Sequence, residues 1–144
     1  MNFELIELTE INEIYKTYDI YKYCMFNPTA EKFEHKIISF LKDNYVKIFA
    51  CLVNGETAGI IVISFTEQNK AEIIGVAVAV SFRNKGVASY MVKQIMEKYS
   101  LIYMLAETDN DAVGFYHNTG FSIEEFSEIY GDETVIRYKC ELTK

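Results

Sequence analysis

Cysteine and histidine are scarce in this chain of 144 residues, and this scarcity limits its chemistry. The three cysteines are far apart, at positions 24, 51 and 140, and the two histidines are isolated from them and from each other. An odd number of scattered thiols argues against a disulfide framework, and no Cys-x-x-Cys pair suggests a metal site. We therefore expect a reducing, cytoplasmic compartment and no bound metal.

Long apolar runs and basic stretches are also missing. Half of the residues are hydrophobic, yet no run approaches the roughly 18 to 20 apolar residues of a membrane span, and residues 1–10 lack a signal-peptide pattern. The net charge of −7 argues against a nucleic-acid backbone as partner. We expect one domain over residues 1–144, without membrane or nucleic-acid partners, working as a monomer or homodimer.

Hydrophobic periodicity predicts a mixed α/β sheet with helices on both faces, in the order βααβββαβαββ. Thr9 is a candidate cap for the first helix, and Pro28-Thr29 precedes the second, whose inward side includes Leu41. Asn54-Gly55 is a type I′ hairpin signal. The expected strands cover residues 3–8, 46–53, 56–66, 71–80, 101–107, 121–130 and 134–142.

The most informative segment is residues 71–88, where a strand leads through a glycine turn into an amphipathic helix. Backbone N–H groups at such a helix start lack partners and bind anions. Gly86 lets a ligand approach the backbone, and Ala88 keeps the helix close. We expect a phosphate-bearing cofactor here, although an ordinary β-to-α turn remains the alternative. The turn consists of Arg83, Asn84, Lys85, Gly86, Val87 and Ala88.

The strand over residues 71–80 alternates large side chains at even positions with small ones at odd positions after Ile73. One interpretation is a central strand beneath a closely packed helix. The other adds a β-bulge near Gly75, which would break the ladder and splay this strand from its neighbour.

A second segment, residues 106–121, is expected to form a strand end, a short helix and the start of a new strand. Thr108 or Asp109 can cap the helix, and Gly120 can end it. Phe115 and Tyr116 share one helical face with Ala112.

Together these two segments resemble the GNAT superfamily of acyl-CoA N-acyltransferases. The first is similar to the family's pyrophosphate motif, with Arg83, Gly86 and Ala88 at its fixed positions. The second is similar to a downstream signature formed by Asn110, Ala112, Phe115, Tyr116, Gly120 and Phe121. The resemblance covers roughly residues 70–121, and over residues 1–69 it extends only to the order of elements.

This resemblance implies a GNAT-like fold with splayed central strands and acetyl-CoA as cosubstrate. The splay would form a slot for the pantetheine arm, which would pair with the backbone of Val76, Ala77 and Val78. The Val76 N–H would face the thioester carbonyl, as in an oxyanion hole. Asn110 would hydrogen-bond the cofactor or only cap its helix.

The resemblance also implies direct attack of a primary amine on the thioester. Only about one alkyl amine in a thousand is neutral at pH 7, so a base must take its proton. Glu72 is the candidate, since apolar flanks would raise its pKa. A surface role for Glu72 stays open, with Glu107 or Asp109 as other bases. Tyr116 would protonate the leaving thiolate, unless it is only a core tyrosine.

The acceptor is not defined by the sequence. Tyrosines in residues 18–28 and carboxylates in residues 124–133 suit an amine cation, but they are equally typical of a core and a solvated hairpin. A polyamine, an amino sugar, an amino acid and a protein amine all remain open. A noncatalytic acyl-CoA sensor and a structural protein are the alternative functions.

Overall fold

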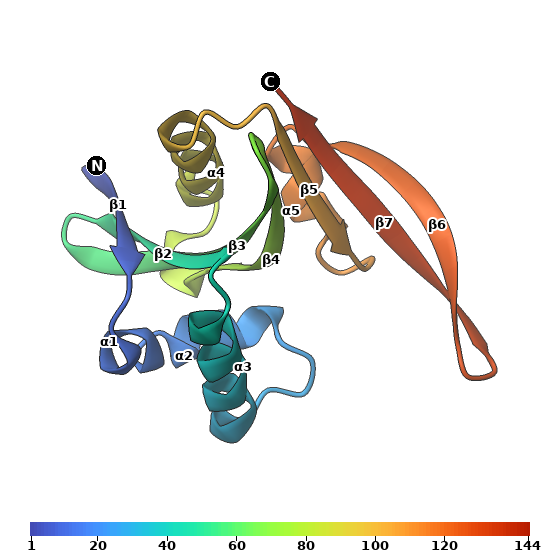
Figure 1. Cartoon of the computed structure of the whole chain (residues 1–144), viewed down its shortest axis with the longest axis horizontal. Coiled ribbons are helices and arrows are strands. Elements are labelled where there is room, and N and C mark those ends of the chain that lie inside the picture. Colours follow the sequence, from blue (N-terminus) through green and yellow to red (C-terminus); the bar gives the residue numbers. More distant parts are fainter.

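The computed structural model describes all of residues 1–144 and is built on one seven-stranded sheet of order β1-β2-β3-β4-β5-β7-β6 (Figure 1). Neighbouring strands are antiparallel except for β4 and β5, which are parallel. This confirms the mixed sheet. The strands are β1 (Phe3–Leu8), β2 (Val46–Val53), β3 (Glu56–Glu67), β4 (Lys70–Val78), β5 (Tyr103–Thr108), β6 (Ser122–Tyr130) and β7 (Glu133–Thr143).

Helices cover both faces of the sheet, as expected. Three lie on one face, namely α1 (Ile11–Tyr15), α2 (Tyr18–Tyr21) and α3 (Ala30–Lys42), followed on the other face by α4 (Val87–Lys98) and α5 (Val113–Asn118) (Figure 1). Two short 3-10 helices, η1 (Lys22–Cys24) and η2 (Val80–Phe82), precede the loops that lead into α3 and α4. None of the helices combines the length and apolar character needed to cross a membrane.

The central strands β2 and β3 are buried on both faces because their side chains alternate between two cores. Ile60 and Val62 pack under α1–α3, whereas Ile61 and Ile63 pack under α4. A Cβ at Gly59 would lie 3.0 Å from side-chain atoms of Met91 and Val87. Glycine at this position therefore allows α4 to pack directly against β3.

The two parallel strands in the middle of the sheet separate soon after they meet. β4 and β5 pair only at Lys70↔Tyr103, Ala71↔Met104 and Glu72↔Leu105. On its other side β4 stays paired with β3, but the register skips Ile74, since Val62 faces Gly75 and Ile63 faces Ile73. The bulge near Gly75 and the splay that we expected are thus confirmed.

The bulge corrects the expected alternation of β4. Ala71 and Ile73 face the core under α4, but beyond the extra residue Val76 and Val78 face it instead. The two faces therefore exchange at the bulge, and the interpretation of one large and one bare face is wrong. The strand also ends at Val78 rather than residue 80.

Three other local expectations, on the first helix, its cap and Leu41, are wrong. The first helix is split into α1 and α2 at Thr17, whose Oγ1 donates to the Ile14 carbonyl at 2.6 Å. Glu10 rather than Thr9 precedes α1, without a side-chain cap. Leu41 is 41% exposed instead of buried, because α3 turns only Phe33 and Ile37 fully inward.

The expected hairpin turns are confirmed. Asn54 and Gly55 both have positive φ, 51° and 84°, as a type I′ turn requires. Gly131 has φ 61° in the turn between β6 and β7, which extend together well beyond the rest of the sheet (Figure 1).

The bulge generates a stability prediction. A Cβ at Gly75 would overlap the Tyr21 hydroxyl, which packs against the bulge, so Gly75→Ala should lower the free energy of unfolding by about 1 to 3 kcal/mol. Gly114→Ala is the matched control, because its Cβ has open space within α5 and should stabilise by about 0.5 to 1 kcal/mol. Urea unfolding measures both variants, and equal stability of Gly75→Ala and the wild type would contradict the packing described.

Candidate active site

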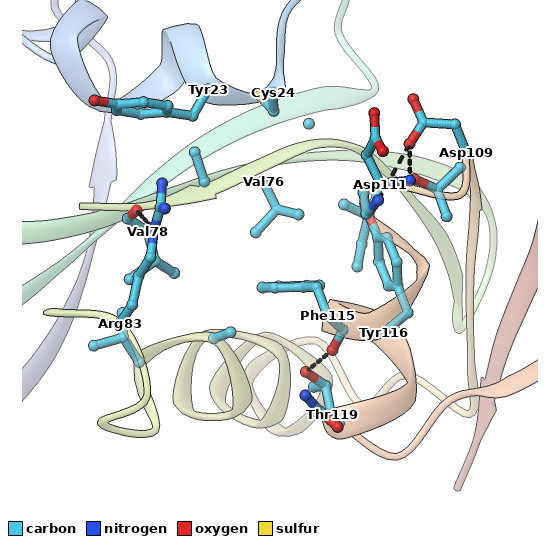
Figure 2. A pocket seen from close by; sticks show the side chains of 18 of the residues that line it. Tyr23, Cys24, Val76, Val78, Arg83, Asp109, Asp111, Phe115, Tyr116 and Thr119 are labelled. Atoms are coloured by element: carbon cyan, nitrogen blue, oxygen red, sulfur yellow. Dashed lines mark hydrogen bonds between the residues drawn. The ribbon is translucent and has the colours of Figure 1, made fainter. Parts of the chain in front are cut away.

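A cavity of about 1050 Å³ lies where β4 and β5 separate. Its walls come from η1 and the loop after it, from β4, from the start of α4, and from α5 with the end of β5. Figure 2 shows Val76 and Phe115 pointing into the space from opposite sides, below Tyr23 and Cys24. The bulge and splay of the fold therefore open directly into one site.

One end of the cavity is a helix start with free backbone donors. Gly86 precedes α4 with φ 82°, a conformation that favours glycine. The first backbone bond of the helix is from Tyr90 N to Gly86 O at 3.0 Å, and the N–H groups of residues 84–89 donate to no carbonyl. The positive end of the α4 dipole adds to these donors. Of the expected phosphate-loop residues, five line the cavity: Arg83, Asn84, Gly86, Val87 and Ala88.

Arg83 spans the cavity from this turn toward β4. Its Nε donates to the Val78 carbonyl at 3.2 Å, and its guanidinium carbon lies 5.0 Å from the ring centroid of Tyr23 (Figure 2). Lys85, in contrast, does not line the cavity, and its Nζ lies 5.8 Å from the centroid of the Phe82 ring. The structure therefore brings one of the two expected cations to the site.

The edge of β4 that faces the cavity carries backbone groups that no neighbouring strand pairs. Since Arg83 reaches the Val78 carbonyl, that carbonyl points away from β3 and into the splay. Backbone groups alternate along an antiparallel strand, so those of Val76 point the same way while Ala77 pairs with Ile60. All three residues expected along the slot, Val76, Ala77 and Val78, line the cavity.

Cys24 is a cavity residue that sequence reasoning missed. Its Sγ donates to the Tyr21 carbonyl at 3.2 Å. Cys24 is exposed at the cavity surface, but desolvation of its thiol raises the pKa of that thiol to about 11, while the neighbouring Tyr21 hydroxyl and Val76 N–H oppose the rise. The thiol thus lies at the Val76 amide, and no sequence pattern around residue 24 indicates this.

The opposite wall is organised by the loop before α5. Asp109 Oδ1 accepts the N–H groups of Asp111 at 3.0 Å and Ala112 at 3.2 Å, so Asp109 rather than Thr108 caps the turn before α5, whereas α5 itself begins after Ala112 without a side-chain cap (Figure 2). Asn110 does not line the cavity. Its Oδ1 accepts a hydrogen bond from the Tyr138 hydroxyl at 3.1 Å, which ties the loop to β7.

Tyr116 lines the cavity from α5 with only 6% of its surface exposed. Its ring packs edge-on against Phe115 and Phe121, with centroids 5.0 and 5.3 Å away. The hydroxyl makes no hydrogen bond within the chain. Burial, with smaller contributions from Cys140 and Cys24, raises its pKa far above neutrality. The hydroxyl is therefore protonated and available as a donor.

Glu72 lies next to the cavity rather than on its wall. It is half-buried on β4, opposite Leu105 of β5, and burial followed by the charge of Glu107 raises its pKa. Glu107 itself lines the cavity. The structure therefore brings together two carboxylates, and Glu72, whose pKa is raised, is the more buried of the two. No group of three or more His, Cys, Asp or Glu side chains is arranged to hold a metal ion.

A mixed sheet that splays at its central parallel pair, beside the N-terminus of a helix, is the architecture of an acyl-CoA-dependent acyltransferase. Comparison with known families agrees. Residues 9–121 match the family described as the acetyltransferase (GNAT) family. The chain belongs to this family, whose enzymes transfer an acyl group from acetyl-CoA to an amine.

Solved structures show the same fold at low sequence identity. The chain aligns over 100% of its length with 96% of a Salmonella typhimurium acetyltransferase that modifies the N-terminal serine of ribosomal protein L7/L12, at TM-score 0.78 and 14% identity. The alignment with an Elizabethkingia anophelis GNAT acetyltransferase that has acetyl-CoA bound covers 99% of both chains, at TM-score 0.71 and 18% identity.

A third structure is the Escherichia coli ribosomal-protein-S18-alanine N-acetyltransferase. Its alignment covers 99% of this chain and 94% of the E. coli chain, at TM-score 0.72 and 15% identity. No protein of curated function matches the sequence.

The position of Cys24 predicts a pH-dependent modification. Only the thiolate reacts with iodoacetamide, and a pKa of about 11 leaves about one thiol in a thousand ionised at pH 8. We expect Cys24 to react far more slowly than a free cysteine with pKa of about 8.5, and about tenfold faster per pH unit up to pH 10. Peptide mapping by mass spectrometry gives the rate, and fast labelling independent of pH between 7 and 9 would contradict the environment described.

Proposed function

We propose that this chain, acting as a single domain over residues 1–144, transfers the acetyl group of acetyl-CoA to a primary amine. The observation that carries the proposal is the continuity of the site. Free N–H groups at residues 84–89, the open edge of β4 and the Tyr116 hydroxyl all line one cavity. The donor set suits an anionic, amide-rich cosubstrate.

In this proposal each end of acetyl-CoA is bound by a different part of the chain. The N–H groups of residues 84–89 and the Arg83 guanidinium bind the diphosphate, since both are preorganised anion donors. Val76 and Val78 offer their backbone groups to the amides of the pantetheine arm. The Val76 N–H, which lies near the Cys24 thiol, would donate to the thioester carbonyl. Asn110 lies outside the cavity wall and its Oδ1 accepts from Tyr138, so the Nδ2 donors are the groups it has left for the cofactor.

The proton of the amine passes to Glu72, directly or through water. A raised pKa brings a carboxylate closer to the pH at which a general base is effective, and burial and Glu107 raise that of Glu72. Because Glu72 lies behind the cavity wall, Glu107 is the residue through which the proton would pass, or the base itself. The two roles can be separated by substitution.

Tyr116 donates the proton that the thiolate of coenzyme A needs on departure. Its hydroxyl is protonated, buried and without another partner, which suits a general acid.

We propose that the acceptor is a soluble amine and that the reaction takes place in the cytoplasm. Among the similar structures, two act on ribosomal proteins and two are variants of a spermidine N-acetyltransferase, so these four share an amine acceptor.

Coenzyme A should stabilise the folded chain. Free ligand at about 100 times its Kd adds about 2.7 kcal/mol, which corresponds to a rise in Tm of roughly 5 to 10 °C for a chain of this size. Ala88→Glu should abolish the rise, because it places a carboxylate at the start of α4 where the diphosphate would lie.

The folded state of that variant is not expected to suffer, since a carboxylate suits a helix N-terminus. Gln94→Glu, which adds the same charge later in α4, should keep the full shift. A thermal titration with no shift in the wild type would sink the cofactor proposal.

Substitutions should separate the acid from the base. Tyr116→Phe should lower kcat by about 10² to 10⁴ while the thermal shift with coenzyme A is retained. Glu72→Gln should lower kcat/KM to a similar extent, whereas Glu107→Gln should retain more activity. In the wild type, kcat/KM should fall as the pH drops through the raised pKa of Glu72, where the base becomes protonated.

Release of thiol from acetyl-CoA measures these rates. Full turnover by Tyr116→Phe at every pH would exclude it as the acid. A greater loss in Glu107→Gln than in Glu72→Gln would transfer the role of base to Glu107. Binding of coenzyme A without thiol release with any amine would indicate a noncatalytic acyl-CoA sensor.

A further inference from the structure

The cavity contains two guanidinium groups, and the cofactor proposal uses only one of them. Arg83 lies at the diphosphate end, bound to Val78. Arg137 lines the same cavity but comes from β7, where it is paired with Phe126 of β6. The proposed binding of acetyl-CoA gives Arg137 no role, so its presence in the wall calls for another explanation.

The Arg137 side chain has an unused hydrogen-bond donor. Its Nε is fully buried and makes no hydrogen bond. The carboxylate of Glu128 lies within ion-pair distance, with Oε2 3.7 Å from Nε. The same oxygen already accepts a 2.8 Å hydrogen bond from the Tyr130 hydroxyl. The side chain is 27% exposed and its charge faces Glu128, but Nε itself lacks a hydrogen-bond acceptor, and a guanidinium is best satisfied by a carboxylate that bonds it directly. The site is therefore suited to an anionic group on a ligand.

Arg137 lies beside the carboxylates proposed to receive the proton of the amine. Glu107 on β5 is directly opposite Lys139 on β7, and Arg137 is two residues from Lys139 on the same strand. Residues two apart on a strand share a face, so Glu107 and Arg137 are diagonal neighbours on one face, about 7 to 8 Å apart. An anion site thus borders the place where the amine would react.

The other acids of the cavity are less free to bind a cation than their number suggests. Asp109 uses Oδ1 to accept two backbone N–H groups. The side chains of the other two wall carboxylates, Glu107 and Asp111, make no hydrogen bond within the chain, and Glu107 is the one on the face of Arg137. The polar groups left for an acceptor are therefore of both signs, the Arg137 guanidinium together with the carboxylates of Glu107 and Asp111.

We propose that the acceptor is an amino carboxylate, a small molecule such as a free amino acid whose amine and carboxylate are a few bonds apart. Arg137 binds the carboxylate, which directs the amine toward Glu107 and Glu72. This inference rests on the proposed acetyl transfer and narrows its substrate class. A polyamine would instead place a second cation beside Arg137, where repulsion disfavours it.

The test compares acceptors that differ only at the carboxylate. Thiol release from acetyl-CoA is measured with a panel of free amino acids, with the corresponding amino-acid amides, and with spermidine. For its best amino acid the wild type should show kcat/KM about tenfold or more above that for the amide, as expected for a charge-assisted hydrogen bond. Equal or faster turnover of amides or spermidine would overturn the inference.

Substitution at Arg137 supplies the second part of the test. Arg137→Gln should remove the preference for the carboxylate mainly by raising KM, while Arg137→Lys should restore part of it. Lys139→Gln, which removes the same charge from the same strand outside the cavity wall, should keep the preference. A uniform loss on every acceptor in Arg137→Gln would mean a structural role and would refute the inference.

The thermal shift with coenzyme A keeps the two proposals apart and should be the same in the wild type and in Arg137→Gln. Acetyl transfer without a carboxylate preference contradicts this inference alone. A wild type that binds coenzyme A yet releases no thiol with any acceptor contradicts the proposed function, and this inference falls with it.

Discussion

The separation of β4 from β5 is the constraint on which the site depends. These strands share three residue pairs and then part, because Ile74 is an extra residue in the ladder with β3 and Tyr21 packs against the glycine that follows it. A strand edge left open inside a protein carries backbone donors and acceptors that need partners. In this chain those of Val76 and Val78 face a cavity, so the same distortion that interrupts the sheet creates a binding slot.

The two ends of the slot carry charges of opposite sign. At one end the start of α4 and Arg83 present positive charge. At the other, Glu107 lines the wall with Glu72 behind it, and the charge of one raises the pKa of the other. In the proposed reaction the anionic cosubstrate binds at the first end and the amine at the second, so that the reacting atoms would meet between them, beside Tyr116.

Much of this was predictable because it is local in sequence. The glycine turn before α4, the type I′ turn at Asn54-Gly55 and the Asp109 cap depend on residues within a few positions of one another. Even the bulge was indicated by Gly75. Contacts between distant elements were not predictable: Cys24 reaches the Val76 amide across the sheet, and Tyr138 occupies Asn110. Arg137 gave no signal either, since a lone arginine in a strand becomes informative only when its buried Nε and its neighbours are known.

The most direct test of this account is a crystal structure of the chain with acetyl-CoA. The diphosphate is expected on the N–H groups of residues 84–89, the pantetheine arm along Val76 and Val78, and the thioester next to Tyr116, with β4 and β5 still apart. A cofactor bound elsewhere, or a sheet in which β4 and β5 have paired along their whole length, would contradict the account at its centre.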